Sequence, residues 1–569
     1  MRRSFGVSWL IAAAMLTTQG NISQAQNVIW TGDTGSFVDG GNWSTGSVPD
    51  FGETALINNG GTAQFADDFV EMQLLKLGQS GSSGNFEQSS GQFNANGAIF
   101  GDGGSANGSI TGGEFIIGGD SIHVGLLPGG VGVLNISGSD TVVASGDDFQ
   151  LGREGTGTLN FSGGFLHAGY TVIGKFGTGV WNQTGGLFDQ DFGDIEIGDG
   201  GRDDQAGTGG PRTGTMNIDG GFVQTADSIA IGNRRGDGAV SITDGILAVT
   251  GNATSSILIG RGMDTTPGAG GVNSLRIKGD AAKIVATGSL LMDPNQAVQS
   301  ATLIEEITGP SQTTIYAAGG ADVGNGTLKV ELNGYTPKAN DSWVLVQVGL
   351  DIDGMLGDID AAVEAAGYEP MQHAFPENFG ELVGPFADTD FSGASLPAGL
   401  SWEVSYTADS IILNVVGTGA TGDFDGNGVL DANDINLLSA AVRAGNNPSE
   451  YDLNGDNAVN QTDRDVWVND LKKTYMGDSN LDGQFDSSDF VFVFQAGQYE
   501  DGVAGNSNWE TGDWNGDTEF DSSDFVTAFQ NGGFENGPRA AVAAVPEPAS
   551  ITLVGMILLC WGALRRRCV

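Results

Sequence analysis

The chain has 569 residues, of which 95 are glycine, 70 are acidic and only 23 are basic. The formal net charge of −47 argues against nucleic acid and anionic lipid as partners, because both repel an acidic surface. Proline is sparse and glycine has no three-residue period, which excludes collagen. Three histidines and two cysteines leave little from which to build zinc, haem or iron–sulfur sites.

The first 25 residues have the three parts of a secretory signal peptide. Arg2 and Arg3 supply the positive start, and Val7–Leu16 is a short apolar run. Ser23-Gln24-Ala25 follows as a cleavage site of the small-x-small type. We therefore expect residues 1–25 to act as a signal peptide and the protein to be exported.

The C-terminus has a second targeting pattern. Pro546-Glu547-Pro548 precedes a mostly apolar run, residues 549–564, which ends at the cluster Arg565–Arg567. These parts, in this order, resemble the PEP-CTERM sorting signal of bacteria. The resemblance implies that residues 546–569 hold a short hydrophobic transmembrane helix, a transient anchor at residues 549–564 that an exosortase-type protease removes. It also implies a location at the cell envelope, the outer surface or outside the cell; a plain C-terminal membrane anchor is the alternative.

An apolar residue followed by glycine recurs every 22–34 residues, at the end of a β-prone run. Such a period is typical of a β-solenoid, in which glycine supplies the positive φ of the corners. The glycines are Gly78, Gly101, Gly125, Gly152, Gly174, Gly198, Gly232 and Gly260. We predict a mainly β fold, a right-handed parallel β-helix or β-solenoid of eight coils over residues 76–265. A β-sandwich with hairpin repeats is the alternative.

A second repeat, Gly-x-apolar-Asn, lies between these corners and begins at Gly132, Gly157, Gly179 and Gly214. It predicts strands whose apolar side chains point inward and whose polar side chains point outward. We expect the recurrent asparagine to form a hydrogen-bonded ladder between coils. The region resembles the autotransporter-like repeats of bacterial surface proteins.

The two ends of the repeat region differ from its middle. Residues 26–75 are expected to cap the first coil, with Trp30 and Trp43 covering its open edge. Residues 198–212 are expected to form an inserted loop. The period fades near Thr266, so residues 266–418 are expected to form a C-terminal β-sheet unit with one helix at Asp351–Gly367. Its predicted strands are Thr327–Leu332, Trp343–Val346, Leu400–Tyr406 and Ile411–Val416.

From residue 419 onward, acidic residues gather in four loops that fit the EF-hand-type calcium loop, with Asp in place of Glu at position 12. Positions 1, 3, 5, 9 and 12 offer side-chain oxygens, and position 7 offers a backbone carbonyl. A solvated acidic surface does not explain why the same offsets occur four times. The residues at positions 1, 3, 5, 7, 9 and 12 are Asp423, Asp425, Asn427, Val429, Asp431 and Asp434 in loop 1; Asp452, Asn454, Asp456, Ala458, Asn460 and Asp463 in loop 2; Asp478, Asn480, Asp482, Gln484, Asp486 and Asp489 in loop 3; and Asp513, Asn515, Asp517, Glu519, Asp521 and Asp524 in loop 4.

Asp at position 12, and the offset of 29 residues between loops 1 and 2, resemble the type I dockerin. The resemblance implies small α-helical modules at residues 419–474 and 475–533, a linker at 534–545, up to four bound Ca²⁺ ions and a cohesin-like partner. Ser487-Ser488 and Ser522-Ser523 make loops 3 and 4 the stronger docking candidates. Position 6 of the loop requires a positive φ, which a β-branched residue such as Thr518 adopts poorly. Loop 4 is therefore expected to bind calcium most weakly.

We prefer a non-enzymatic function, an exported structural or adhesive protein that binds calcium and contacts extracellular polysaccharide. The alternative is a polysaccharide lyase or glycoside hydrolase, because dockerins accompany such enzymes. A lyase needs clustered cations, but the solenoid has few: Arg153, Lys175, Arg202, Arg212, Arg234, Arg235 and Arg261. Three of them directly follow a corner (Arg153, Lys175 and Arg261) and could line one edge, but we interpret them as solubilising corner residues. His123 and His167 have no neighbouring nucleophile, so no catalytic residue is assigned.

Overall fold

The structure is a computed structural model that describes residues 26–199, 212–261, 271–294, 300–350, 352–368, 380–397, 400–417 and 421–539. These residues divide into two compact units, with the boundary near residue 416. The predicted signal peptide, residues 200–211 of the predicted inserted loop, and the predicted sorting segment lie outside the described residues.

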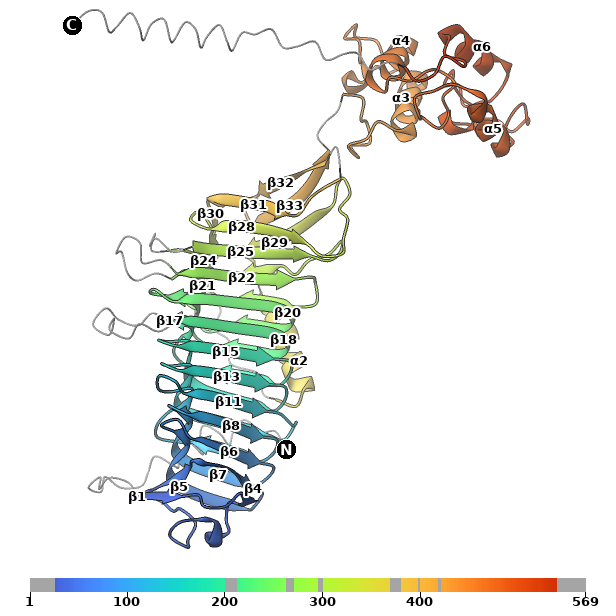
Figure 1. The fold of residues 1–569 in the computed structure, drawn as a ribbon. Coiled ribbons are helices and arrows are strands. Elements are labelled where there is room, and N and C mark those ends of the chain that lie inside the picture. The colour runs from blue at the N-terminus through green and yellow to red at the C-terminus, as the bar shows by residue number, and fades with distance from the viewer. Residues whose placement is uncertain are drawn as a thin grey trace, which may run out of the picture. The chain divides into compact units, whose positions relative to one another are not determined.

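The first unit is a parallel β-solenoid of about eleven turns, with strands stacked in rows (Figure 1). The mainly β fold and the solenoid are therefore confirmed. Each complete turn has a strand segment in each of three rows, here named A, B and C. Some strands bend at a corner and serve two rows in succession.

Row A holds the asparagine repeat. It consists of β2 (Thr34–Ser36), β4 (Asn59–Phe65), β6 (Ser83–Gln88), β8 (Ser105–Ile110), β11 (Val131–Ile136), β13 (Thr156–Phe161), β15 (Thr178–Gln183), the first parts of β18 (Thr213–Thr225) and β20 (Asp237–Val249), β22 (Val272–Lys278), β25 (Ser300–Ile307), β28 (Thr327–Leu332) and β31 (Asp388–Gly393).

Rows B and C form the other two faces. Row B consists of the first parts of β5 (Phe69–Gln79), β7 (Gln92–Asp102), β12 (Val142–Leu151) and β14 (Phe165–Ile173), the last parts of β18 and β20, and β9 (Glu114–Ile117), β16 (Leu187–Gln190), β23 (Lys283–Ala286), β26 (Ile315–Ala317) and β29 (Ser342–Val348). Row C consists of β1 (Gln26–Ile29), β3 (Glu53–Ile57), the last parts of β5, β7, β12 and β14, and β10 (Ile122–Val124), β17 (Ile195–Asp199), β19 (Ile229–Asn233), β21 (Ile257–Ile259), β24 (Leu290–Met292), β27 (Ala321–Asp322) and β30 (Leu382–Val383).

The predicted asparagine ladder is present in row A. Asn217 Nδ2 donates to Asn182 Oδ1 (2.9 Å), and Asn182 Nδ2 donates to Asn160 Oδ1 (3.0 Å). The chain of bonds continues through Asn135 to Asn107, at 2.8 and 3.0 Å. The amides of Asn135, Asn160 and Asn182 thus each donate to the preceding turn and accept from the next. The residues on either side of an asparagine, such as Leu159 and Phe161, are buried, which confirms the alternation.

The two tryptophans expected to cover the first coil are both buried. Trp30 and Trp43 are buried and meet edge to face, with ring centroids 5.0 Å apart. Trp43 Nε1 donates to the carbonyl of Phe37 (2.7 Å), and the Phe37 ring contacts Phe65 and Phe93 of the following turns. A short 3-10 helix, η1 (Gly40–Asn42), lies in this cap.

The parallel rows continue past residue 265, which corrects the expected eight coils and the separate β unit over residues 266–418. Leu275, Leu303 and Leu328 are in register in row A and are all buried. At one corner Asp293, with φ of 44°, stands where earlier turns have glycine. Aspartate tolerates this conformation, so the repeat loses its glycine signature but keeps its geometry.

The last turn ends the parallel pattern. β33 (Ser410–Gly417) pairs antiparallel with β29, and β32 (Leu400–Tyr406) precedes it. The strands predicted at residues 327–332, 343–346, 400–406 and 411–416 are therefore all present.

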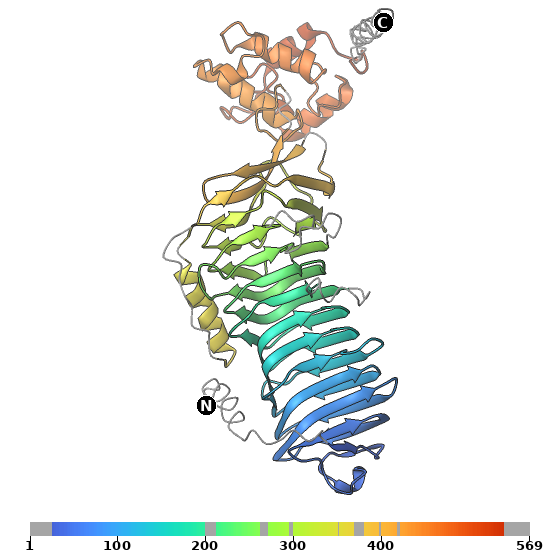
Figure 2. The same ribbon diagram turned by 90° about the vertical axis from the view of Figure 1, so that its left-hand side faces the viewer.

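The predicted helix near residue 351 is α2 (Asp353–Ala365), which lies beside the solenoid (Figure 2). Its buried residues Leu356, Ile359 and Val363 pack on an apolar patch that includes Leu187 and Ile246 of row B. The patch is on the outer face of the row, so one helix covers several successive turns.

The corner glycines give a direct test of the close stacking. Gly174 has φ of 74°, and a Cβ there would lie 2.0 Å from the carbonyl oxygen of Thr213 in the next turn. Gly129 has φ of 80°, but nothing lies within 4 Å of its Cβ position. Both alanine substitutions incur the cost of left-handed backbone, about 1–2 kcal/mol. Gly174→Ala should lose a further ~1–3 kcal/mol through overpacking.

The measurement is the urea midpoint of the solenoid transition in the two variants. A loss in Gly174→Ala no larger than that in Gly129→Ala would contradict the role of close approach at the corner.

Candidate calcium centres

The second unit holds the four predicted loops, and each loop leads directly into a helix. The helices are α3 (Ala432–Ala444), α4 (Gln461–Val466), α5 (Ser487–Ala496) and α6 (Ser522–Asn531). In all four, position 9 of the loop is the N-cap and position 12 is the third helical residue, joined in a reciprocal capping box. Asp and Asn at the cap favour this geometry because they satisfy the free N–H groups of the first turn.

In each of the four loops, backbone amides donate hydrogen bonds to the aspartates at positions 1 and 12. The amide of position 6 donates to the aspartate at position 1 at 2.7–2.8 Å in every loop. The amide of position 9 donates to the aspartate at position 12 at 2.9–3.0 Å. These bonds place the first and last predicted ligands of each loop by means of its own backbone.

Loop 1 brings three predicted ligands together. One carboxylate oxygen each from Asp423, Asp425 and Asp434 lies within 4.8 Å of the others. Asn427 Nδ2 donates to Asp425 and to Asp431, at 3.0 and 3.1 Å. Hard cations such as Ca²⁺ prefer this kind of oxygen cluster. Loops 2, 3 and 4 have Asn at position 3, and no equally tight group of three carboxylates occurs in the part of them that the structure describes.

Burial raises the pKa of several of these carboxyl groups. The pKa of Asp478 and that of Asp524 are each raised to about 6, mainly by burial. Burial also raises the pKa of Asp434, against the effect of the three amides that donate to it. Clustered carboxylates at low exposure therefore carry an unfavourable charge, which a bound divalent cation would offset.

Position 6 has positive φ where it is not glycine: 66° at Asn457 and 78° at Thr518. Asparagine visits this region readily, but a β-branched threonine is strained there. The strain is the basis of the expectation that loop 4 binds most weakly, which stays a prediction.

Two arginines contact loop 4, and the sequence pattern did not reveal them. Arg464 of α4 is fully buried and donates to the carbonyls of Trp514 (3.0 Å) and Asn515. Arg443 of α3 donates to the carbonyl of Gly516 (2.6 Å). Burial lowers the pKa of Arg464 to about 10, so the side chain stays cationic at neutral pH. Both arginines are 50 or more residues away in sequence, so no local motif indicates these contacts.

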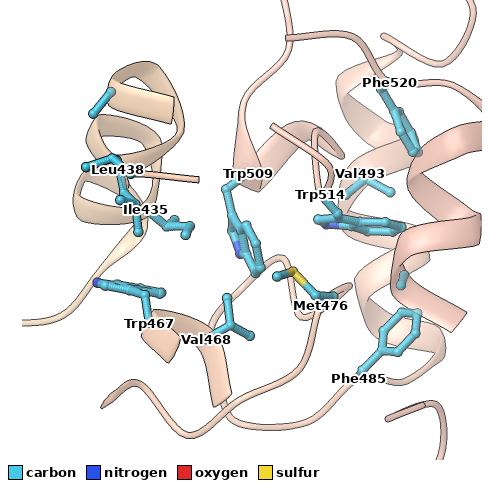
Figure 3. Packing of buried hydrophobic residues seen from close by; sticks show 13 residues of the cluster. Ile435, Leu438, Trp467, Val468, Met476, Phe485, Val493, Trp509, Trp514 and Phe520 are labelled. Atoms are coloured by element: carbon cyan, nitrogen blue, oxygen red, sulfur yellow. The ribbon is translucent and has the colours of Figure 1, made fainter. Parts of the chain in front are cut away.

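One hydrophobic core lies under all four loops (Figure 3). It includes Ile435 and Leu438 from α3, Trp467 and Val468 from the π-helix η4 (Trp467–Leu471), and Trp509 and Trp514 from the second half. The boundary expected at residues 474–475 therefore does not separate two cores. Two short 3-10 helices, η3 (Ser449–Tyr451) and η5 (Trp509–Thr511), complete the unit.

Tryptophan side chains connect this core to the loop backbone. Trp467 Nε1 donates to the carbonyl of Gly422, just before loop 1, and Trp509 Nε1 donates to that of Asp478 in loop 3, both at 2.8 Å. Trp514 Nε1 donates to Ser479 Oγ (3.0 Å). Core packing and loop position are therefore coupled.

The solenoid has a polar cluster on the outer face of row C that was not assigned from sequence. Asn233 Nδ2 donates to Glu196 Oε1 (2.5 Å), and Arg234 forms an ion pair with Asp199 (2.7 Å). Burial, followed by the charge of Asp199, raises the pKa of Glu196 to about 7. Tyr170 is hydrogen-bonded to Glu196. The only local sign of this cluster in the sequence is that Glu196 lies between two apolar residues of a strand, Ile195 and Ile197.

The three cations that follow corners lie in two different surroundings. The pKa of His123 is lowered to about 4, mainly by burial and then by the positive charge of Arg153. The charge of Lys175 lowers it further. Arg261 instead forms an ion pair with Asp194. Arg212 lies over the ring of Phe176, and Arg202 lies outside the described residues.

Comparison with protein-family models, with curated proteins and with solved structures finds no match for this chain. None of the helices in the described part of the chain combines the length and the apolar character that a membrane span requires. The segment predicted as a transient anchor, residues 549–564, lies outside that part.

Proposed function

We propose that this chain is an exported, calcium-binding structural or adhesive protein in which a β-solenoid is joined to a dockerin-like calcium unit. The observation that carries the proposal is the repeated loop geometry. Four loops hold their first and last aspartates with the same backbone bonds, and loop 1 gathers three carboxylates within 4.8 Å. Calcium is the cation that such oxygen-only loops suit best.

The proposed destination and partners follow from the terminal patterns. Residues 1–25 direct export, and residues 546–569 act as a PEP-CTERM sorting segment that anchors the chain until an exosortase-type protease cleaves it. The solenoid serves as a spacer that contacts extracellular polysaccharide.

Docking to a cohesin-like protein is proposed through α5 and α6. Ser487, Ser488, Ser522 and Ser523 are exposed at the starts of these helices. Apolar side chains are also exposed on the same two helices: Val491, Phe492, Phe494, Val526 and Phe529. Exposed apolar patches of this kind mark interaction surfaces.

Calorimetric titration of the full chain with Ca²⁺ tests the proposal. We expect up to four sites, with affinities of roughly 10⁻⁴–10⁻³ M, as in extracellular modules. Asp434→Asn should remove one site, whereas Asp470→Asn, an exposed acid outside the loops, should leave the stoichiometry unchanged. Absence of calcium uptake, or equal uptake by both variants, would contradict calcium binding in loop 1.

A polysaccharide lyase or glycoside hydrolase is the second candidate, and the row C cluster supports it. Glu196 has a pKa near neutrality, which suits a general acid, and Tyr170 and Arg234 lie close to it. If incubation with a polysaccharide panel releases reducing ends or unsaturated uronates, Glu196→Gln should reduce the rate by about 10²–10⁴-fold. The control is Asp219→Asn, an exposed acid on β18. No cleavage by the wild-type chain, or an undiminished rate in Glu196→Gln, would reject this site.

A further inference from the structure

Three polar side chains form a column on the outer face of row B. His167 of β14 is in register with Asp189 of β16, and Asp189 is in register with Gln224 of β18. Each stands two residues after a side chain that packs towards α2: Phe165, Leu187 and Phe222. Since side chains alternate along a strand, all three point outward. Neighbouring strands are about 4.8 Å apart, so the side chains are within reach of one another.

A second carboxylate comes from the turn after β16. Asp191 Oδ2 lies 3.9 Å from His167 Nε2, and Asp189 Oδ2 lies 3.5 Å from His167 Nδ1. The turn is held in place on both sides of its backbone. Gln190 Nε2 donates to the Gly193 carbonyl (2.5 Å), and the Gly193 amide donates to Asp227 Oδ2 (2.9 Å).

The two distances end on different nitrogens of one imidazole, and a single ion would bind only one of them. The 3.5 Å between Asp189 Oδ2 and His167 Nδ1 suits two ligands that share such an ion. Two ligand atoms at about 2.0–2.1 Å from a tetrahedral Zn²⁺ would lie about 3.4 Å apart. One ligand atom each from His167, Asp189 and Asp191 lies within 4.8 Å of the others. The Phe165 ring stacks on His167, with centroids 6.3 Å apart, and limits how the imidazole turns.

The charges that act on His167 are those of the two aspartates. With a neutral imidazole the group carries a formal charge of about −2, which a divalent cation balances. Burial lowers the pKa of His167, but the hydrogen bond to Asp189 and the charges of Asp189 and Asp191 outweigh it and raise this pKa above its usual value.

Gln224 is the independent observation that points to a ligand. Its side chain is only 1% exposed, and neither its Oε1 nor its Nε2 has a hydrogen-bond partner among the described residues. An amide buried in this way costs about 1–3 kcal/mol. Its register partner in the next turn, Ala248, is apolar. A cation held by Asp189, the adjacent residue in the column, would give Oε1 a partner.

We propose that His167, Asp189 and Asp191, with the Gln224 carbonyl oxygen, bind one first-row divalent transition-metal ion, Zn²⁺ in the first instance. An imidazole nitrogen distinguishes this site from the oxygen-only calcium loops, because Zn²⁺ accepts nitrogen ligands and Ca²⁺ prefers oxygen. The small number of histidines does not prevent such a site, since it needs only one. The ion would link three successive turns of the solenoid.

The test uses the full chain in excess Ca²⁺, so that the loops are occupied and only the additional metal is counted. Zinc is titrated by calorimetry, and Co²⁺ in its place reports ligation through visible absorption. We expect one equivalent of Zn²⁺ in the wild type. His167→Ala and Asp191→Asn should bind it more than about 100-fold less tightly, because even outer-shell partners contribute about 10–100-fold. Asp191 is half exposed, so its substitution is compatible with folding.

Two further variants separate a metal site from other readings. His123→Ala removes another buried histidine of the solenoid and should leave zinc binding unchanged. Gln224→Leu should weaken zinc binding and also stabilise the metal-free chain. The proposal is overturned if wild type and Asp191→Asn bind zinc equally, or if Gln224→Leu only stabilises the fold. It is equally overturned if His167→Ala destabilises a chain that takes up no zinc, which would indicate an imidazolium held between two carboxylates.

Discussion

Chelation of calcium is expected to unfold residues 421–539 while the solenoid stays folded. A ligand present at 100 times its dissociation constant stabilises the folded state by about 2.7 kcal/mol per site. Four such sites contribute about 11 kcal/mol, which is as large as the whole stability of a typical domain. The solenoid has an apolar interior and an asparagine ladder of its own, so we expect its stability to be independent of the calcium loops.

The measurement is calorimetric unfolding of the full chain, followed also by near-UV circular dichroism. One sample contains Ca²⁺ at 100 times its dissociation constant, and the other contains excess chelator. Trp467, Trp509 and Trp514 are buried in the calcium unit and report its packing. We expect one transition to move to much lower temperature and the other to stay in place. A Mg²⁺ arm is the control, because Mg²⁺ demands a smaller octahedral site. If neither transition moves on chelation, calcium has no structural role here.

Trp509→Ala is expected to destabilise the calcium unit by about 3–5 kcal/mol, the usual cost of truncating a large buried aromatic residue. Trp509 is 1% exposed, and its Nε1 donates to the carbonyl of Asp478, the first predicted ligand of loop 3. Its own amide is held by Asn436 Oδ1 of α3 (3.0 Å). The truncation therefore removes packing and also loosens a loop and the contact to α3.

The matched control is Phe492→Ala on α5, where the ring is 45% exposed. A surface substitution of this kind should change the free energy of unfolding by no more than about 0.5 kcal/mol. Urea unfolding at fixed Ca²⁺ measures both variants, and calorimetry measures their calcium uptake. Equal losses in the two variants would show that Trp509 does not join the halves of this unit.

Local periodicity explains what was predictable in the solenoid. Leu159, Asn160 and Phe161 alternate, and Asn recurs at one position of four successive turns, so inward faces and the ladder followed from spacing alone. The glycine corners were predictable where glycine is present. Asp293 takes the same conformation without that signature, and the turns beyond residue 265 were missed for this reason.

In the calcium unit, the loops and the helices that follow them were predictable because capping and ligand spacing are properties of about twelve consecutive residues. The single core was not, since Trp467 and Trp509 meet only through folding. Arg464 at loop 4 is a further case, because its partners lie 50 and 51 residues away.

The sequence, rich in glycine and in acidic residues, therefore determined the repeat and the acidic loops. Both depend on contacts within one turn or one loop, where the spacing of residues in the sequence fixes their distances in the structure. Only the tertiary structure decided that α2 covers the outer face of row B and that one core underlies four loops. It also decided that His167, Asp189 and Gln224 form one column. Stacking of the turns decides which residues are neighbours in such a column. The turns differ in length, so His167 and Asp189 are 22 positions apart in sequence but Asp189 and Gln224 are 35 apart.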